Sequence, residues 1–328
     1  MSTEIELKLQ LDPHDAEKLS SHPLLSGLPH KAQALLNTYF DSPALTLHDK
    51  KVALRLRKKG EQWLCTVKTA EPATGGLARR SEWEVPATPG SFDFSHVDAP
   101  ALRDMLESMR ASFVPIFTTD FVRKSWELPF GESTIEFAID QGFVESRGRK
   151  AAISEIELEL IAGQIEDLFA LSQQLQADFD LRPALASKAE RGYALFLDAP
   201  PQPCQALRPS VVTDVPPREA FRELALACLE IFQRNAEGIR KGDETAFIAP
   251  AINALNWLQE DLAKFRSALP EAFFSNYAEQ WAHVARTLAT GQADTIERAM
   301  QGRGLSQLIL AFTADLYALE EPAGSRTA

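Results

Sequence analysis

Apolar and polar residues alternate through the first two hundred positions with the two-residue period of a β-strand. In the opening MSTEIELKLQL, isoleucine and leucine occupy one face, and glutamate and lysine occupy the other. The same alternation predicts eight strands, at residues 4–11, 36–41, 51–58, 62–69, 80–86, 114–128, 133–145 and 152–161. Helical spacing predicts helices at 15–21, 100–109, 165–177 and 187–196. Eight strands are about the number that closes a small barrel, which would remove exposed sheet edges.

A proline-rich stretch at 199–219, APPQPCQALRPSVVTDVPPRE, interrupts this pattern. Beyond it, apolar residues recur at i, i+3 and i+4 in FRELALACLEIFQRNAEGI and in three later segments, which predicts a helical bundle. We therefore expect an α+β chain with a β-domain at 1–200, a linker at 201–216 and a helical domain at 217–322.

The composition is that of a globular protein, with 328 residues of which 45% are hydrophobic. The net charge of −12 disfavours nucleic acid and anionic membranes as partners. The longest uncharged stretch, at 245–259, is too short to span a bilayer, and the first residues lack the pattern of a signal peptide. We expect a cytoplasmic protein with no nucleic-acid or membrane partner.

The polar faces of the predicted strands are rich in charge and are segregated by strand. A charged strand face is usually solvated when it occurs alone. Here it recurs in strand after strand, with some faces basic and others almost purely acidic. Glu-x-Glu repeats bring like charges together, which favours a bound hard cation such as magnesium or manganese. Basic faces suit phosphate oxygens, so the combination predicts a polyphosphate site inside a closed sheet.

Several motifs occur in the order found in the CYTH superfamily, the triphosphate tunnel metalloenzymes. They are the N-terminal ExExK at Glu4, Glu6 and Lys8, followed by TYFDS, ALRLRK, TVKTA, EWEVP, EIELEL and SKAERGYAL. The chain resembles this family over about residues 1–200. The resemblance implies an eight-stranded antiparallel tunnel that hydrolyses a triphosphate with a divalent metal, Mg²⁺ or Mn²⁺.

The resemblance also implies roles for individual side chains. Metal binding would fall to Glu4, Glu6, Asp140, Glu155, Glu157 and Glu159. Phosphate binding would fall to Lys8, Arg55, Arg57, Lys68, Arg123, Lys188 and Arg191. The candidate catalytic set consists of these cations with Glu4, Glu6 and two residues expected to line the tunnel, Glu82 and Glu84.

The helical half resembles the CHAD domain, a helical partner often fused to CYTH modules. It carries Ile252, Asn256 and Leu258 where the resemblance implies a histidine followed by arginines. From Pro201 onward there are 12 Lys and Arg against 16 Asp and Glu, a net charge of −4. We expect a degenerate domain that packs against the tunnel or mediates oligomerisation, which leaves a homo-oligomer open.

The resulting hypothesis is an inorganic triphosphatase that converts triphosphate to pyrophosphate and phosphate. The alternatives are an adenylate cyclase of the class IV type, a thiamine triphosphatase and a non-catalytic polyphosphate-binding module. A thiamine triphosphatase would need an aromatic platform, and the alternation predicts that Trp63, Trp83 and Trp126 point away from the lumen. Retention of both acidic strands favours catalysis over binding alone.

Overall fold

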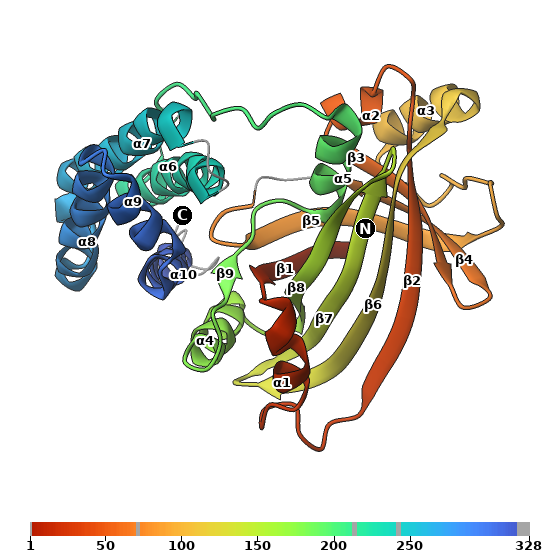
Figure 1. The fold of residues 1–328 in the computed structure, drawn as a ribbon, viewed down its shortest axis with the longest axis horizontal. Coiled ribbons are helices and arrows are strands. Elements are labelled where there is room, and N and C mark those ends of the chain that lie inside the picture. The colour runs from red at the N-terminus through yellow and green to blue at the C-terminus, as the bar shows by residue number, and fades with distance from the viewer. Residues whose placement is uncertain (1, 70–72, 212–214, 241–243, 320–328) are drawn as a thin grey trace, which may run out of the picture. The chain divides into compact units, whose positions relative to one another are not determined.

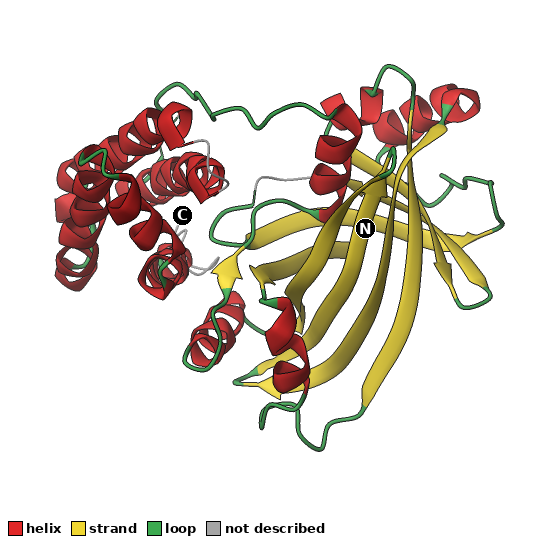
Figure 2. Ribbon diagram, viewed as in Figure 1, coloured by secondary structure: helices red, strands yellow, loops and turns green. Residues whose placement is uncertain are grey.

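The structure is a computed structural model that describes residues 2–69, 73–211, 215–240 and 244–319. The chain divides into two compact units. The first comprises Met1–Ala73, Leu77–Leu168 and Ala186–Ala199, and the second comprises Thr74–Gly76, Phe169–Leu185 and Pro200–Ala328. Strands dominate the first unit and helices the second (Figures 1 and 2).

Eight antiparallel strands of the first unit form a closed sheet, which we call the tunnel. The strands are β1 (Ser2–Gln10), β2 (His30–Asp41), β3 (Val52–Lys59), β4 (Gln62–Thr69), β5 (Leu77–Ala87), β6 (Val114–Phe130), β7 (Ser133–Ser146) and β8 (Arg149–Ala162). They are hydrogen-bonded in the order β5-β4-β3-β2-β6-β7-β8-β1, and pairing between β1 and β5 closes the sheet. The predicted eight-stranded antiparallel tunnel is confirmed.

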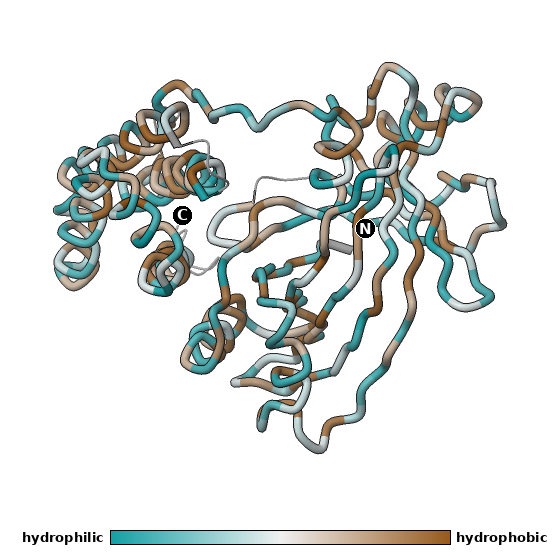
Figure 3. The backbone as a smooth tube through the Cα atoms, viewed as in Figure 1, coloured by the Kyte–Doolittle hydropathy of each residue, from teal (hydrophilic) through white to brown (hydrophobic). Residues whose placement is uncertain are grey.

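Hydrophilic and hydrophobic residues alternate along the strands of the sheet (Figure 3). In most strands this alternation puts apolar side chains on the outer face and polar or charged side chains on the inner face. On β1, Leu7 and Leu9 are fully buried in the outer layer. The inward side chains of Glu6 and Lys8 are also buried, with only 3% and 4% of their surface exposed. The polar face of the opening strand therefore meets the lumen of the tunnel and not bulk water.

Short helices surround the tunnel. They are η1 (Pro13–Asp15), α1 (Ala16–Ser20), α2 (Thr46–Asp49), α3 (Pro100–Met109), η2 (Arg110–Ser112) and α5 (Lys188–Leu197), and α4 (Ile165–Gln176) follows β8. Leu106 of α3 packs outside the sheet with Trp83 and Phe94. The helix α5 packs against β6, β7 and β8. The helix α3 thus covers part of the apolar outer face, whereas α5 lies against the inner face, where Lys188 reaches Asp140 and Gly192 meets Phe117.

The structure differs from the sequence expectation mainly at element boundaries. The strand β2 begins at His30 instead of residue 36, because the segment before it pairs with β6 although it lacks strict alternation. The helix expected at 15–21 is divided into η1 and α1. The short elements α2 and β9 (Arg182–Pro183) were not predicted.

The second unit contains the predicted helices around their own core. These are α6 (Pro217–Arg240), α7 (Glu244–Lys264), η3 (Arg266–Ala268), α8 (Glu271–Ala289), α9 (Ala293–Gln301) and α10 (Arg303–Ala318), of which α9 was not predicted. Phe232, Trp281 and Phe312 meet at the centre of the core. Within the described part of the chain, no helix combines the length and the apolar character that crossing a membrane requires.

Candidate active site

The basic wall of the tunnel comes from β3 and β4. Arg55 and Arg57 project from β3, and Lys68 from β4, on the face opposite the apolar outer cluster. Lys68 Nζ lies 2.8 Å from an oxygen of Glu4 and 2.8 Å from an oxygen of Glu82. Arg55 Nη2 lies 3.5 Å from Glu82 Oε1. Lysine and arginine here are already engaged by carboxylates of neighbouring strands.

Arg57 is the most weakly paired cation of this wall. Its Nη1 lies 3.9 Å from Glu84 Oε2, while its Nε donates a hydrogen bond of 2.8 Å to Asn37 Oδ1. Burial and the neighbouring Arg55 lower the pKa of Arg57 to about 10. Arg57 therefore keeps its charge at neutral pH but lacks sufficient negative charge nearby, which is the condition that favours binding of an anion.

The ExExK residues of β1 form a buried ionic chain with β5 and β8. Lys8 Nζ lies 3.3 Å from Glu6 Oε1 and 3.3 Å from Glu157 Oε1. Arg80 Nη2 of β5 lies 2.6 Å from Glu6 Oε1. Burial lowers the pKa of Lys8, but Glu6 and Glu157 outweigh burial and raise it overall, so Lys8 is protonated.

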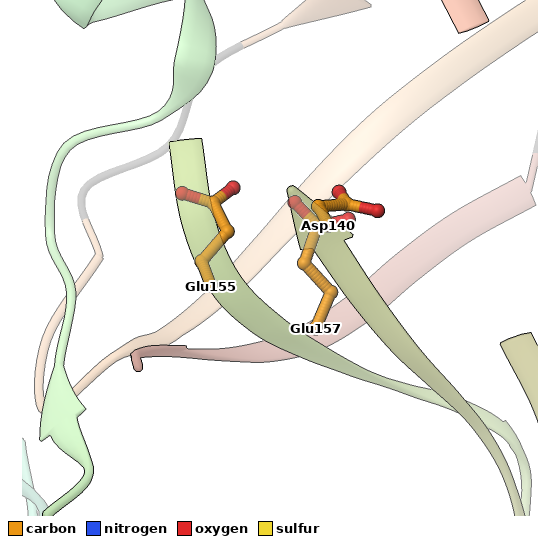
Figure 4. A group of neighbouring side chains, drawn as sticks. All are labelled: Asp140, Glu155 and Glu157. Carbon is orange, nitrogen blue, oxygen red and sulfur yellow. The ribbon is translucent and has the colours of Figure 1, made fainter. Parts of the chain in front are cut away.

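Three carboxylates of β7 and β8 converge on one point, which we call the carboxylate cage: Asp140, Glu155 and Glu157. Each offers an oxygen, and the three oxygens lie within 4.8 Å of one another (Figure 4). The ammonium of Lys188, at the start of α5, is bound there. Its Nζ lies 2.6 Å from Asp140 Oδ2 and 2.9 Å from Glu157 Oε1, and it also donates to Glu155.

Arg123 of β6 also binds the carboxylate cage. Its Nε and Nη2 bind the two oxygens of Asp140 at 2.8 and 2.7 Å, and it also pairs with Glu157. Burial raises the pKa of Glu157, but Lys188 and Arg123 outweigh burial and hold this pKa well below its usual range. Glu157 is therefore ionised, with its negative charge balanced by the protein's own cations.

A second group of carboxylates lies around Glu159. Unlike the carboxylate cage, it has too few cations nearby to balance its negative charge. Glu159 of β8 is paired with Glu6 on the neighbouring strand β1 and with Glu136 on the neighbouring strand β7. Burial and the nearby Glu4 and Glu136 raise the pKa of Glu159 to about 7. This part of the lumen carries more negative charge than its local cations compensate.

Both acidic groups fit a divalent metal by the chemistry of their donors. Carboxylate oxygens are the ligands that hard cations such as magnesium and manganese prefer. The cage supplies three converging oxygens, and the raised pKa of Glu159 indicates a place where additional positive charge would be favourable. The donor set matches no soft-metal site, which would call for thiolate or imidazole ligands.

Arg191 completes the set from α5. Its Nη1 lies 3.2 Å from Glu155 Oε2, and its Nη2 donates to the carbonyl of Ala152. The candidate residues named from the sequence therefore occupy connected strands and one helix of the same unit, on the inner side of the sheet. Their positions are observed, whereas their catalytic and binding roles stay predictions.

Four further residues of the lumen were absent from the candidate set. Arg80 and Glu136 stand on charged faces that the alternation identifies, so the signal was present but assigned no role. Asn37 orients Arg57, and its other contact is a hydrogen bond of 2.8 Å to Thr119. Burial raises the pKa of Tyr39, but Arg55 outweighs burial and lowers it overall. No periodicity distinguishes these two residues from ordinary strand positions.

Comparison with known proteins places the tunnel in a family. A family model for the CYTH domain matches residues 2–193. The chain belongs to the CYTH family. The family model does not match the residues from 194 onward.

The chain is similar to a curated protein named inorganic triphosphatase, from Haemophilus influenzae (strain ATCC 51907 / DSM 11121 / KW20 / Rd). The two are 35% identical over 206 residues, which is 60% of this chain and 55% of that protein. The chain thus spans about half the length of this curated relative.

Two solved structures also align with the CYTH domain. One is described as a putative adenylyl cyclase, HpAC1, from Hippeastrum with a dominant triphosphatase activity; it is 22% identical, with 60% of this chain and 95% of that chain covered and a TM-score of 0.46. The other is a putative adenylate cyclase from Bacillus halodurans, at 19% identity, 57% and 96% coverage and a TM-score of 0.40. At these TM-scores the two likenesses carry no weight for function.

Proposed function

We propose that this protein is a metal-dependent inorganic triphosphatase that hydrolyses triphosphate to pyrophosphate and phosphate inside the tunnel. The proposal rests first on one observation, the paired charges of the lumen. Lys68 is bound by Glu4 and Glu82, and Arg123 and Lys188 are bound by Asp140. A complex of triphosphate with a divalent cation also carries both charges. Its phosphate oxygens would bind the lysines and arginines of these ion pairs, and its cation would bind the carboxylates.

In this exchange, Glu4, Glu6, Asp140, Glu155, Glu157 and Glu159 would hold the metal. Lys8, Arg55, Arg57, Lys68, Arg123, Lys188 and Arg191 would turn to the phosphate oxygens. A divalent cation bound by these carboxylates would supply neutralisation of phosphate charge and polarisation of a phosphoryl oxygen. Ion pairs buried in the lumen cost desolvation energy, which a ligand of complementary charge would offset.

The reaction needs little from the protein beyond position and charge. Phosphoryl transfer to water proceeds mainly through orientation and electrostatic stabilisation, so a covalent nucleophile is not required. Arginines are suited to the charge that develops on the phosphoryl oxygens, because a guanidinium binds two oxygens at once. Arg123 binds Asp140 in this two-point geometry, which is the geometry a phosphate would use.

The curated relative named inorganic triphosphatase supports the choice of substrate. The positions of the tryptophans are unfavourable to a thiamine substrate. Trp63 and Trp83 pack in the outer cluster with Phe94, and Trp126 packs edge-on against Phe137, so none supplies a platform in the lumen. The test below distinguishes triphosphate hydrolysis from cyclase activity and from binding without catalysis.

The test is phosphate release from purified protein supplied in parallel with inorganic triphosphate, ATP and thiamine triphosphate, each with Mg²⁺, with Mn²⁺ and with EDTA. We expect fast, metal-dependent release from inorganic triphosphate and much slower release from the two organic substrates. Cyclic AMP formed from ATP without phosphate release would replace the proposal with a cyclase. Binding of triphosphate without any product would replace it with a binding module.

A further inference from the structure

The helix α5 delivers two candidate phosphate-binding side chains, Lys188 and Arg191, to the lumen. Lys188 is its first residue, and only 7% of the surface of Lys188 is exposed. A short helix has little stability of its own, so its position must come from contacts with the tunnel. These contacts determine where the Lys188 ammonium lies.

The central contact is a hydrogen bond between Tyr193 of α5 and Asp41, the last residue of β2. The Tyr193 hydroxyl donates to Asp41 Oδ2 at 2.8 Å. Asp41 is fully buried and also accepts from the backbone N–H groups of Ser42, Leu47 and His48, at 2.7, 2.8 and 2.9 Å. One buried carboxylate therefore ties α5 to the end of β2 and to α2, and Tyr193 supplies its one side-chain hydroxyl donor.

The ring of Tyr193 and the adjacent glycine fix the distance of α5 from the sheet. The ring lies between His48 and Phe117, with centroid distances of 4.7 and 5.2 Å. A Cβ at Gly192 would lie 2.2 Å from the Phe117 ring, so only glycine permits this approach. The helix thus packs on β6 through its own backbone.

The two ends of α5 are held independently of Tyr193. At its start, Ser187 and Glu190 form a reciprocal capping box. At its end, Arg149 of β8 donates a hydrogen bond of 2.6 Å to the carbonyl of Leu195. Removing the Tyr193 hydroxyl should therefore loosen the attachment of α5 to the end of β2 without unfolding the helix.

We propose that Asp41 and Tyr193 are positioning residues for the tunnel, and that their hydrogen bond holds α5 where Lys188 and Arg191 can bind phosphate. Neither residue reaches the substrate in this account; both act through the helix. The effect on phosphate binding rests on the proposed function, whose substrate is inorganic triphosphate. The positioning of α5 by the hydrogen bond does not depend on that function.

The test is Tyr193→Phe, which removes the hydroxyl and keeps the ring. With inorganic triphosphate and Mg²⁺, we expect KM to rise by about three- to tenfold, the effect of losing one hydrogen bond, and kcat to change by less than about twofold. In metal-free protein, the backbone amides of residues 188–197 should exchange with deuterium faster by a similar factor, with β6 unchanged.

A matched control is available in the helical unit. Tyr277 donates a partly buried hydrogen bond of 2.6 Å to the carboxylate oxygen Oδ2 of Asp315. Tyr277→Phe should lower global stability to a similar degree while KM and exchange in α5 stay at the wild-type values. In a Lys188→Met background, Tyr193→Phe should raise KM by less than about twofold, because the two residues act through one path.

The inference would be overturned if Tyr193→Phe kept the wild-type KM and the wild-type exchange of α5. Equal effects of Tyr193→Phe and Tyr277→Phe on KM would also overturn it, because both would then reflect general destabilisation. If the wild-type protein released no phosphate from triphosphate, the proposed function would fail, and the exchange of α5 alone would decide whether the hydrogen bond positions the helix.

Discussion

Lys188 Nζ lies 2.6 Å from Asp140 Oδ2, at the first residue of a helix whose N-terminal dipole disfavours a cation. Burial also lowers the pKa of Lys188, yet the neighbouring carboxylates Asp140, Glu155 and Glu157 raise it overall. The negative charge of the cage therefore outweighs both the helix dipole and the burial of the ammonium, and it keeps Lys188 protonated. A cation is evidently needed among these three carboxylates, whether it comes from the protein or from solution.

Replacing this lysine should expose that need. In metal-free protein, Lys188→Met should lower the free energy of unfolding by about 3–5 kcal/mol, because three carboxylates each lose one cationic partner and keep only Arg123, Lys8 or Arg191 nearby. Urea denaturation measures the effect. Adding Mg²⁺ should recover more stability in Lys188→Met than in the wild type, since the metal would take the vacated position.

The control is Lys124→Met, which removes an exposed partner of Glu17 and should cost less than about 1 kcal/mol. A loss for Lys188→Met as small as that for Lys124→Met would contradict the account of the cage. So would an equal response of Lys188→Met and wild type to Mg²⁺.

The raised pKa of Glu159 predicts a pH dependence of the metal-free protein. Between pH 4.5, the ordinary pKa of a glutamate, and about pH 7, the pKa of Glu159 in the folded protein, folded Glu159 keeps a proton that the unfolded chain releases. The free energy of unfolding should therefore fall as the pH rises through this window and level off above about 7. Thermal unfolding in EDTA across pH 4.5 to 8.5, on the protein and on Glu159→Gln, measures it.

Glu159→Gln cannot release this proton, so its stability should decline less with pH and should exceed that of the wild type at pH 8. Mg²⁺ should weaken the decline in the wild type by compensating the ionised carboxylate. Parallel pH profiles for the wild type and Glu159→Gln would show that another group causes the dependence.

Replacing either of two helical glycines by alanine should change the free energy of unfolding, in opposite directions for the two positions. Gly192→Ala places a methyl group against the Phe117 ring and should destabilise the protein by about 1–3 kcal/mol through overpacking. Gly304 of α10 has open space at its Cβ position, so Gly304→Ala should stabilise by up to about 1 kcal/mol through helix propensity. Urea midpoints of both variants test this, and stabilisation of Gly192→Ala would contradict the packing of α5.

Strand alternation predicted the tunnel because most of its strands carry apolar residues on one face and polar or charged residues on the other. Glu6 beside Leu7 on β1 is the clearest case, with charge facing the lumen and leucine facing the outer layer. The helix at 100–109 was predicted with the bounds of α3, since Pro100 begins it. Where alternation weakens, as between His30 and Leu35 of β2, sheet pairing sets the strand end and the sequence could not predict it.

The sequence predicted which side chains face the lumen, but it could not predict which of them pair with one another. Periodicity places Asp140 and Glu155 on inner faces, but the convergence of both on Lys188 depends on the path of the chain between β8 and α5. Asp41 illustrates a second limit. Its position in TYFDS predicts a strand end, whereas its bond to Tyr193 joins residues far apart in the sequence.

The central claim is that carboxylates of the lumen drive hydrolysis of inorganic triphosphate. The most direct measurement is ³¹P NMR of triphosphate with Mg²⁺ and either wild-type protein, Glu4→Gln, Glu6→Gln or the exposed control Glu107→Gln. We predict equal amounts of pyrophosphate and phosphate with the wild type and Glu107→Gln, and rates lower by roughly a hundredfold or more with Glu4→Gln and Glu6→Gln, each with its fold intact. No products from the wild type, or unchanged rates in both lumen variants, would contradict the account.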